Sequence, residues 1–185
     1  LLAAARNHDV YLEKGIPEQI LFDTMNVVYR YGEECCRPAG RWFYDGSGWA
    51  CRHAGMLMFR IGILEYEMVT TKDDENRISV HIPADAVLSE ENLDASIHGA
   101  RAFFAKYYPE RANDRFHCHS WLLAPKLRDM LPENSGIRRF QNRFGELTQT
   151  DPADECVGYV FRTGPETPVS EYAERTSLQR ALKAL

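Results

Sequence analysis

Apolar and polar residues alternate most clearly in two parts of the chain, and each part predicts β-structure. Residues 56–71 form the most apolar stretch, which fits either one long strand or a hairpin. In one unbroken strand, Phe59 would share a face with Glu65 and Glu67, because successive side chains point to opposite faces. A bulge or a tight turn at Gly62 would instead exchange these faces. The sequence leaves both alternatives open.

The second alternating segment, residues 78–83, predicts a strand that ends at Pro83. Ser89 is a good N-cap for a helix that ends before Pro109, and residues 116–122 are again β-prone. Strand, helix and strand together predict a β-α-β unit with a right-handed connection between neighbouring or near-neighbouring strands. The apolar spacing predicts the following buried stripe on the helix: Leu93, Ile97, Ala100, Phe104 and Tyr107.

Four other segments show a recognisable period or cap. Residues 16–36 have helical spacing, and residues 137–144 fit a helix somewhat better than a strand. Residues 156–162 are rich in β-branched and aromatic side chains and predict a third strand. The sequence from Thr176 to Gln179 is a capping box that starts a C-terminal helix. Residues 37–49 are expected to form a turn-rich loop whose aromatics at 42–44 hold one element onto another, and residues 72–77 are expected to form a turn.

The strand predicted at residues 116–122 carries an unusual density of reactive groups. Cys118 and Ser120 would lie on one face, and His117 and His119 on the other. A metal site that combines these residues with His81 is conceivable, but the alternation divides the ligands between two faces, so no metal is predicted.

Length and composition limit the class of protein. A chain of 185 residues suits one domain, or one domain with an extra helical layer, and its 44% hydrophobic content argues against disorder. No apolar run is long enough for a membrane span, and a net charge of -5 disfavours binding to nucleic acid. Five cysteines, an odd number, indicate reduced thiols. We therefore expect a soluble, cytoplasmic protein with neither nucleic-acid nor membrane partners.

Several spaced sequence blocks together resemble the GNAT-like C-terminal domain family of bacterial acyltransferases. In order along the chain, these blocks are GIPEQIL, FRIGILEYE, HIPADAVLS, FHCHSWLLAPKLRDMLP, SGIRRFQNRF and RTSLQRAL. The resemblance implies an α/β (α+β) fold: a GNAT-like mixed sheet flanked by helices, with a central β-α-β unit. It divides the chain into a helical segment at residues 1–52, packed on the sheet, and an acyltransferase domain at residues 53–185. It also implies a longer chain, with an upstream helical domain as a partner.

The function that this resemblance implies is transfer of an acyl group from acyl-CoA, or a related thioester, to an amine on a small molecule or peptide. GNAT proteins typically hold the pyrophosphate of CoA on a Gly-rich loop before a helix. Here residues 83–89 contain no glycine, and the helix begins with Glu90 and Glu91, which would repel a diphosphate. Three alternatives follow: CoA binds differently, the donor is another thioester, or the domain is a non-catalytic interaction or ligand-binding module.

The candidate catalytic residues follow from the chemistry of acyl transfer. Glu65 or His81 is a candidate base for the amine, and His119 or Ser120 is a candidate donor to the oxyanion or the leaving group. A second hypothesis makes Cys118 a nucleophile that is activated by His81. For each residue, a hydrogen-bonded or packing role in the core is the competing interpretation.

The candidate residues for binding acyl-CoA are Ile82, Arg138 and Arg139. Ile82 lies at the end of the strand at residues 78–83, where this strand and the one at residues 116–122 are expected to splay apart and admit a ligand, and the two arginines form a local basic cluster. The competing interpretation of this cluster is a solvated helix face.

Overall fold

The computed structural model describes residues 2–39, 47–70, 76–112, 115–145, 147, 155–163 and 167–184. The chain divides into two compact units, residues 1–119 and residues 120–185, and each is described by itself. Of the loop predicted at residues 37–49, residues 40–46 lie outside the described residues, whereas residues 37–39 and 47–49 are helical, so the predicted loop is too long. Most of the turn predicted at residues 72–77 also lies outside the described residues.

The first unit contains five helices and four strands among its described residues. They are α1 (Leu2–Lys14), α2 (Glu18–Met25), α3 (Val27–Ala39), α4 (Ser47–Ala54), β1 (Met58–Ile61), β2 (Leu64–Val69), β3 (Arg77–His81), α5 (Glu90–Tyr107) and β4 (Phe116–His117). A 3₁₀ turn, Pro109–Arg111, follows α5. The helix predicted at residues 16–36 is divided at Asn26 into α2 and α3, and α1 was not predicted.

The segment at residues 56–71 is a hairpin, which confirms the alternative with a tight turn at Gly62. Gly62 has φ +63, a left-handed conformation that glycine adopts without a steric penalty. In the antiparallel pairing of β1 with β2, Phe59 faces Tyr66 and Arg60 faces Glu65. Phe59 therefore lies on the face opposite the two carboxylates, and the single unbroken strand is wrong.

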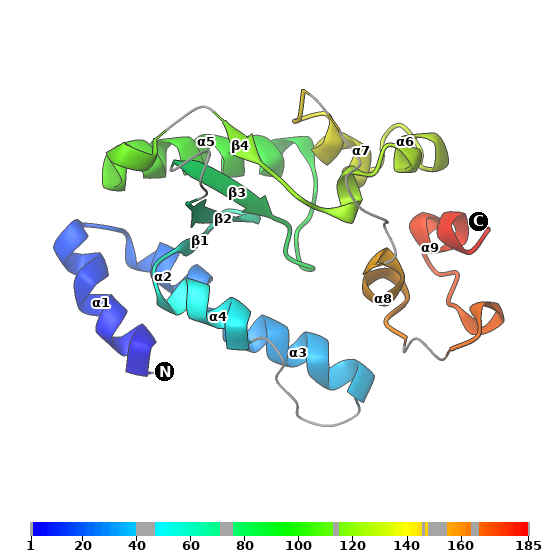
Figure 1. Cartoon of the computed structure of the whole chain (residues 1–185), viewed down its shortest axis with the longest axis horizontal. Helices are drawn as coiled ribbons and strands as arrows, with labels where there is room; N and C mark the ends of the chain where they lie inside the picture. The colour runs from blue at the N-terminus through cyan, green and yellow to red at the C-terminus, as the bar shows by residue number, and fades with distance from the viewer. Residues whose placement is uncertain are drawn as a thin grey trace. The chain divides into compact units, whose positions relative to one another are not determined.

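The apolar face of the sheet packs against α5 (Figure 1). The buried side chains of that face are Phe59, Ile61, Leu64, Tyr66, Ile78 and Val80. Ser89 caps α5 as predicted, by accepting a hydrogen bond from the Asn92 amide. The predicted stripe is partly wrong: Ser96 and Phe103 are buried, whereas Ile97 and Tyr107 are half-exposed. Ser96 is buried because its hydroxyl bonds the hairpin, through Ile61 O and Tyr66 Oη.

The predicted β-α-β unit is confirmed, since β3 and β4 are parallel neighbours connected through α5. The four strands follow the order β1-β2-β3-β4, which gives a mixed sheet with helices on both faces and confirms the predicted fold class (Figure 1). The strand predicted at residues 116–122 is shorter than expected. It ends at His117, and Ser120 caps a 3₁₀ turn, Trp121–Leu123, by accepting a hydrogen bond from the Leu122 amide.

The second unit is helical in its described residues: α6 (Lys126–Met130), α7 (Gly136–Gln141), α8 (Glu155–Phe161) and α9 (Ser177–Lys183), with a 3₁₀ turn at Val169–Glu171. The predicted helix near residue 140 and the capping box at Thr176 are confirmed. The strand predicted at residues 156–162 is wrong. Cys156 and Phe161 are buried while Gly158 and Tyr159 are exposed, which is the spacing of an amphipathic helix and not of a strand.

Candidate functional site

A polar cluster lies on the face of the sheet opposite α5. The register of β2 and β3 places Glu65 opposite His81 and Glu67 opposite Ser79, all on one face. Helices α2 and α4 pack on this side of the sheet (Figure 1). The two-residue turn at Gly62 determines this placement, because a shift of one residue would send the carboxylates into the apolar core.

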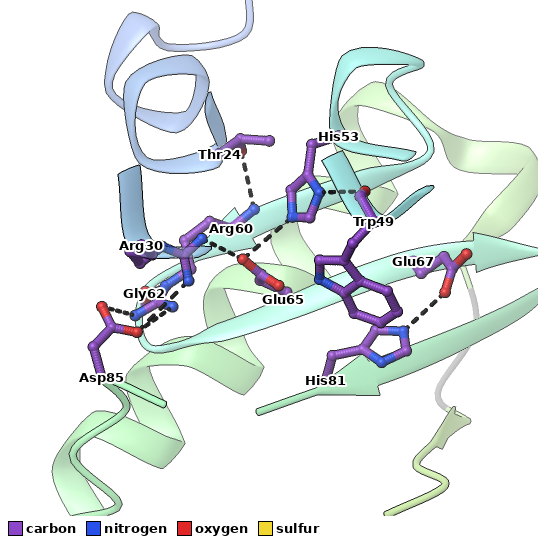
Figure 2. Close-up of polar contacts among 10 residues, drawn as sticks. All are labelled: Thr24, Arg30, Trp49, His53, Arg60, Gly62, Glu65, Glu67, His81 and Asp85. Atoms are coloured by element: carbon purple, nitrogen blue, oxygen red, sulfur yellow. Dashed lines mark hydrogen bonds and ion pairs between the residues drawn. The ribbon is translucent and has the colours of Figure 1, made fainter. Parts of the chain in front are cut away.

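Glu65 is the buried centre of the first part of the cluster (Figure 2). Its side chain is 3% exposed and forms ion pairs with Arg30 from α3 and with His53 from α4. His53 Nε2 lies 3.2 Å from Glu65 Oε1, and Nδ1 of the same ring donates to the carbonyl of Trp49 at 3.0 Å. Burial alone would raise the pKa of Glu65, but His53 and Arg30 outweigh it and hold the pKa at about 2. Glu65 is therefore ionised at neutral pH and is a weak base.

Arg60 and Asp85 connect this cluster to the segment that precedes α5. Arg60 donates two hydrogen bonds to the Asp85 carboxylate, at 3.1 and 3.3 Å, and a third to the carbonyl of Gly62 at 2.7 Å. Arg30 Nη1 lies 3.6 Å from the same Asp85 carboxylate (Figure 2). The segment between β3 and α5 is thus fixed to the sheet by a carboxylate.

His81 occupies the more accessible part of the cluster. Its Nε2 lies 2.8 Å from Glu67 Oε2, and the imidazole packs edge-on against Trp49, with 4.8 Å between ring centroids (Figure 2). Arg52 lies over the Trp49 ring at 4.7 Å and places Nη1 3.4 Å from Glu67 Oε2. Burial lowers the pKa of His81 below its ordinary value, despite the opposing effects of Glu67 and Glu65.

The contacts of His81 determine which of its two ring nitrogens carries the proton when the imidazole is neutral. A carboxylate can only accept, so Nε2 of His81 carries the proton and donates it to Glu67. Nδ1 then holds the lone pair. His81 is 22% exposed, compared with 3% for Glu65, and of the two predicted bases it is the one with a basic nitrogen available near neutral pH.

The other predicted catalytic residues lie around the end of β4. Burial raises the pKa of Cys118 to about 12, so this thiol is protonated at neutral pH and is poorly suited to act as a nucleophile. His119 is exposed. In the second unit, Ser120 Oγ accepts the hydrogen bond of the Leu122 amide, which leaves the hydroxyl proton free to be donated.

The residues predicted to bind acyl-CoA differ in their location and in the contacts of their side chains. Ile82 is half-buried and directly follows β3. Arg138 donates to the carbonyls of Arg128 and Leu131, at 3.0 and 3.2 Å, and so satisfies the end of α6. Arg139 is half-buried on α7.

Two further properties concern the described part of the chain as a whole. Within it, no group of three or more His, Cys, Asp or Glu side chains has an arrangement that would hold a metal ion. None of the helices in the described ranges has the length and hydropathy needed to cross a membrane.

Comparison with known proteins defines the family. A model of the GNAT-like C-terminal domain matches residues 58–185, so the chain belongs to this family and the resemblance seen in its sequence blocks is confirmed. No curated protein gave a significant match.

Solved structures of acyltransferases are also similar to this chain. One is the crystal structure of an acyltransferase in complex with decanoyl-CoA and teicoplanin, with 28% identity and a TM-score of 0.89. Another is an acyltransferase in complex with CoA and 10C-teicoplanin, also with 28% identity and a TM-score of 0.89. Each match covers 98% of this chain and 58% of the solved chain, so this chain spans somewhat over half the length of those enzymes.

Sequence reasoning missed four polar or aromatic partners of the predicted bases: Arg30, Trp49, Arg52 and His53. They come from α3 and α4, which are remote in sequence from the strands they contact. Glu67 was placed beside Glu65 but was not considered as a partner of His81. If residues 56–71 are taken as a hairpin, the alternation of side chains in β2 and β3 places Glu67 and His81 on the same face, so this pair could have been found from the sequence.

Proposed function

We propose that this protein is an N-acyltransferase that transfers an acyl group from acyl-CoA to the amine of a small molecule or peptide. The observation that carries the proposal is the neutral, partly exposed imidazole of His81, in a domain that belongs to the GNAT-like C-terminal family. The similar enzymes solved with decanoyl-CoA and with CoA support an acyl-CoA with a medium-length acyl chain as the donor. The complexes with teicoplanin and 10C-teicoplanin support an amine on a peptide scaffold as the acceptor.

In the proposed reaction, Nδ1 of His81 accepts a proton from the acceptor amine. The amine nitrogen forms a bond to the thioester carbonyl carbon, the C–S bond breaks, and the thiolate of CoA leaves. His119 is the proposed proton donor to the oxyanion or to that thiolate. For Ser120, which belongs to the second unit, the same donor role is a separate proposal. Glu65 is the weaker candidate for the base because its pKa is about 2, and we assign its charge the role of holding Arg30 and His53 in place.

The edge of β3 is the proposed binding site for the pantetheine arm. Two residue pairs join β3 to β4, Ile78 with Phe116 and Ser79 with His117, and no further pair joins these strands within residues 76–112 and 115–145. The proposed contacts for the amides of pantetheine are backbone groups of β3 beyond these two pairs, next to Ile82. A separate proposal, which concerns the second unit by itself, is that Arg138 and Arg139 contact the phosphates of CoA.

Calorimetry with decanoyl-CoA, followed by mass spectrometry of an amine acceptor, tests the proposal. We expect saturable heat, and acyl transfer that is lost in His81→Ala but kept in His98→Ala, which removes an exposed imidazole from α5. His81→Ala should leave the unfolding temperature within a few degrees of the parent. The absence of both binding and transfer, in this chain and in the full-length protein, would overturn the proposal.

One feature favours a second function, that of a non-catalytic ligand-binding domain. The segment before α5 has no glycine, its Asp85 is bound by Arg60, and α5 begins with Glu90 and Glu91. These carboxylates are unsuited to a diphosphate. Saturable binding of decanoyl-CoA without transfer to any amine tested would favour this second function.

A further inference from the structure

Glu67 forms a hydrogen bond with the candidate base His81, yet it has no part in the reaction proposed so far. It lies two residues beyond Glu65 on the same face of β2, diagonally across the ladder from His81. Its side chain is 14% exposed, and Oε2 accepts both His81 Nε2 at 2.8 Å and Arg52 Nη1 at 3.4 Å. Because the carboxylate is held from two sides, its orientation toward the imidazole is fixed.

The same contacts close into a ring of four side chains. Glu67 binds His81, His81 packs on Trp49, Trp49 packs under Arg52, and Arg52 returns to Glu67. The ring holds the imidazole through its Nε2 edge and against the indole. The charged groups that act on His81 are Glu67 and Glu65 from β2 and Arg52 from α4. Each of them lies on an element that is packed against β3.

We propose that Glu67 is a positioning residue for catalysis: it accepts the Nε2 proton of His81 and thereby selects the tautomer whose Nδ1 lone pair receives the proton of the amine. This inference rests on the proposed function, since it assigns a partner to the same base. A carboxylate is suited to this task for two reasons. It fixes the ring by a charge-assisted hydrogen bond, and it stabilises the imidazolium that forms when Nδ1 takes up the proton.

The first test is independent of turnover. Nitrogen-15 NMR of imidazole-labelled protein reports which ring nitrogen of His81 carries the proton. In the parent protein we expect the neutral ring to be protonated at Nε2, and in Glu67→Ala we expect a mixture of tautomers. A parent ring protonated at Nδ1 would overturn the assignment of Glu67, even if the protein were an active acyltransferase.

The second test uses kinetics with the same variants. Glu67→Ala should lower kcat on the order of a hundredfold, with the KM for decanoyl-CoA little changed, because the substrate is bound elsewhere. Glu67→Gln keeps an acceptor oxygen and should recover part of this loss. It should also move the acidic limb of the pH profile to lower pH, because the carboxylate that raises the pKa of His81 is gone.

Glu13→Gln, which neutralises an exposed carboxylate on α1, is the matched control and should leave both the rate and the pH limb unchanged. If the Glu67 variants kept the parental kcat and acidic limb, the proposed role of Glu67 would fail while acyl transfer itself would stand. If no variant and no parent protein transferred an acyl group, the proposed function would fail, and the NMR measurement would still decide the tautomer.

Discussion

Glu65 and Glu67 project from the same face of one strand, yet their partners give them different properties. Glu65 is buried between the guanidinium of Arg30 and the imidazole of His53, and these two partners hold its pKa at about 2 despite burial. Glu67 is closer to solvent and bonds the imidazole of His81. At the scale of single residues, one carboxylate therefore stabilises the fold while the other is free to act on a candidate base.

Replacing the buried carboxylate should have a large effect on stability. Glu65→Gln leaves the guanidinium of Arg30 with only the more distant and exposed carboxylate of Asp85, and should lower the free energy of unfolding by about 3 kcal/mol. Urea denaturation monitored by circular dichroism measures this. Glu13→Gln, at an exposed position on α1, is the control and should change the free energy by less than about 0.5 kcal/mol. If Glu65→Gln lowered the free energy of unfolding by no more than Glu13→Gln does, the ion pairs of Glu65 described above would be contradicted.

The pH dependence of stability should carry the signature of the same group. The folded-state pKa of Glu65 is about 2, below its ordinary value of 4.5, so the ionised form stabilises the fold above pH 4.5 and this contribution is lost as pH falls toward 2. The urea midpoint should therefore fall across that window in the parent protein. It should fall less in Glu65→Gln, which has no carboxylate to protonate, and equal slopes would contradict the assignment.

The thiol of Cys118 offers a third measurement at the residue scale. Because burial raises its pKa to about 12, it should react with iodoacetamide at pH 7.5 far more slowly than the exposed Cys51 of the same protein. Peptide mapping by mass spectrometry reports both rates in one sample. Labelling of Cys118 as fast as Cys51 would revive the nucleophile hypothesis, as would loss of acyl transfer in Cys118→Ser.

At the scale of elements, the hairpin turn at Gly62 determines which side chains of β2 lie on the apolar face of the sheet and which lie on the polar face. Gly62 has φ +63, and a Cβ at this position would approach the Cα and Cβ of Ser96 at 3.2 Å. Gly15 has φ +67 but nothing within 4 Å of such a Cβ. The two glycines therefore have the same backbone conformation and different surroundings.

This difference predicts unequal costs for the same substitution. Gly15→Ala should lose about 1 kcal/mol of unfolding free energy from the left-handed conformation alone. Gly62→Ala should lose more, since it must also displace α5 from the turn. Thermal unfolding of the two variants provides the comparison, and equal losses would show that the contact between the turn and Ser96 is loose.

Elements marked by local side-chain chemistry could be predicted from the sequence. The caps at Ser89 and Thr176 are examples, because each depends on residues within one turn of chain, whereas the turn at Gly62 was one of the alternatives that the sequence left open. The nature of α8 could not be predicted from its β-branched and aromatic composition, since burial of Cys156 and Phe161 outweighed intrinsic preference. His81 was found as a candidate base, whereas its surroundings depend on α4, whose contacts with the sheet leave no local signal.

At the scale of the whole molecule, residues that precede the region matched by the family model make contacts that the sheet depends on. The match begins at residue 58, but Tyr11 packs against Phe59 with 6.2 Å between ring centroids, and Thr24 Oγ1 accepts the amide of Arg60 at 3.0 Å. Arg30 balances Glu65. The helices before residue 52 therefore complete both faces of the sheet, since Tyr11 adds to the apolar face that carries Phe59 and Arg30 neutralises Glu65 on the opposite face.

A shortened chain tests how far these helices are needed. A polypeptide of residues 53–185 should show poor dispersion in its amide NMR spectrum, because Glu65 loses Arg30 and Phe59 loses Tyr11. The complete chain is the control. A well-dispersed spectrum of residues 53–185 would instead establish the predicted acyltransferase domain as an independently folding part.

The close approach of Gly62 to Ser96 has a consequence for the evolution of this family. A relative with a bulkier side chain at position 96 has no room for the tight hairpin, so it should carry an insertion that widens the connection between the two strands. Such an insertion of one residue would also reverse which side chains of the following strand face the candidate base, unless a second insertion restored the phase. In relatives, we therefore expect a change of the residue at position 96 and a change in the length of the connection between β1 and β2 to occur together or not at all.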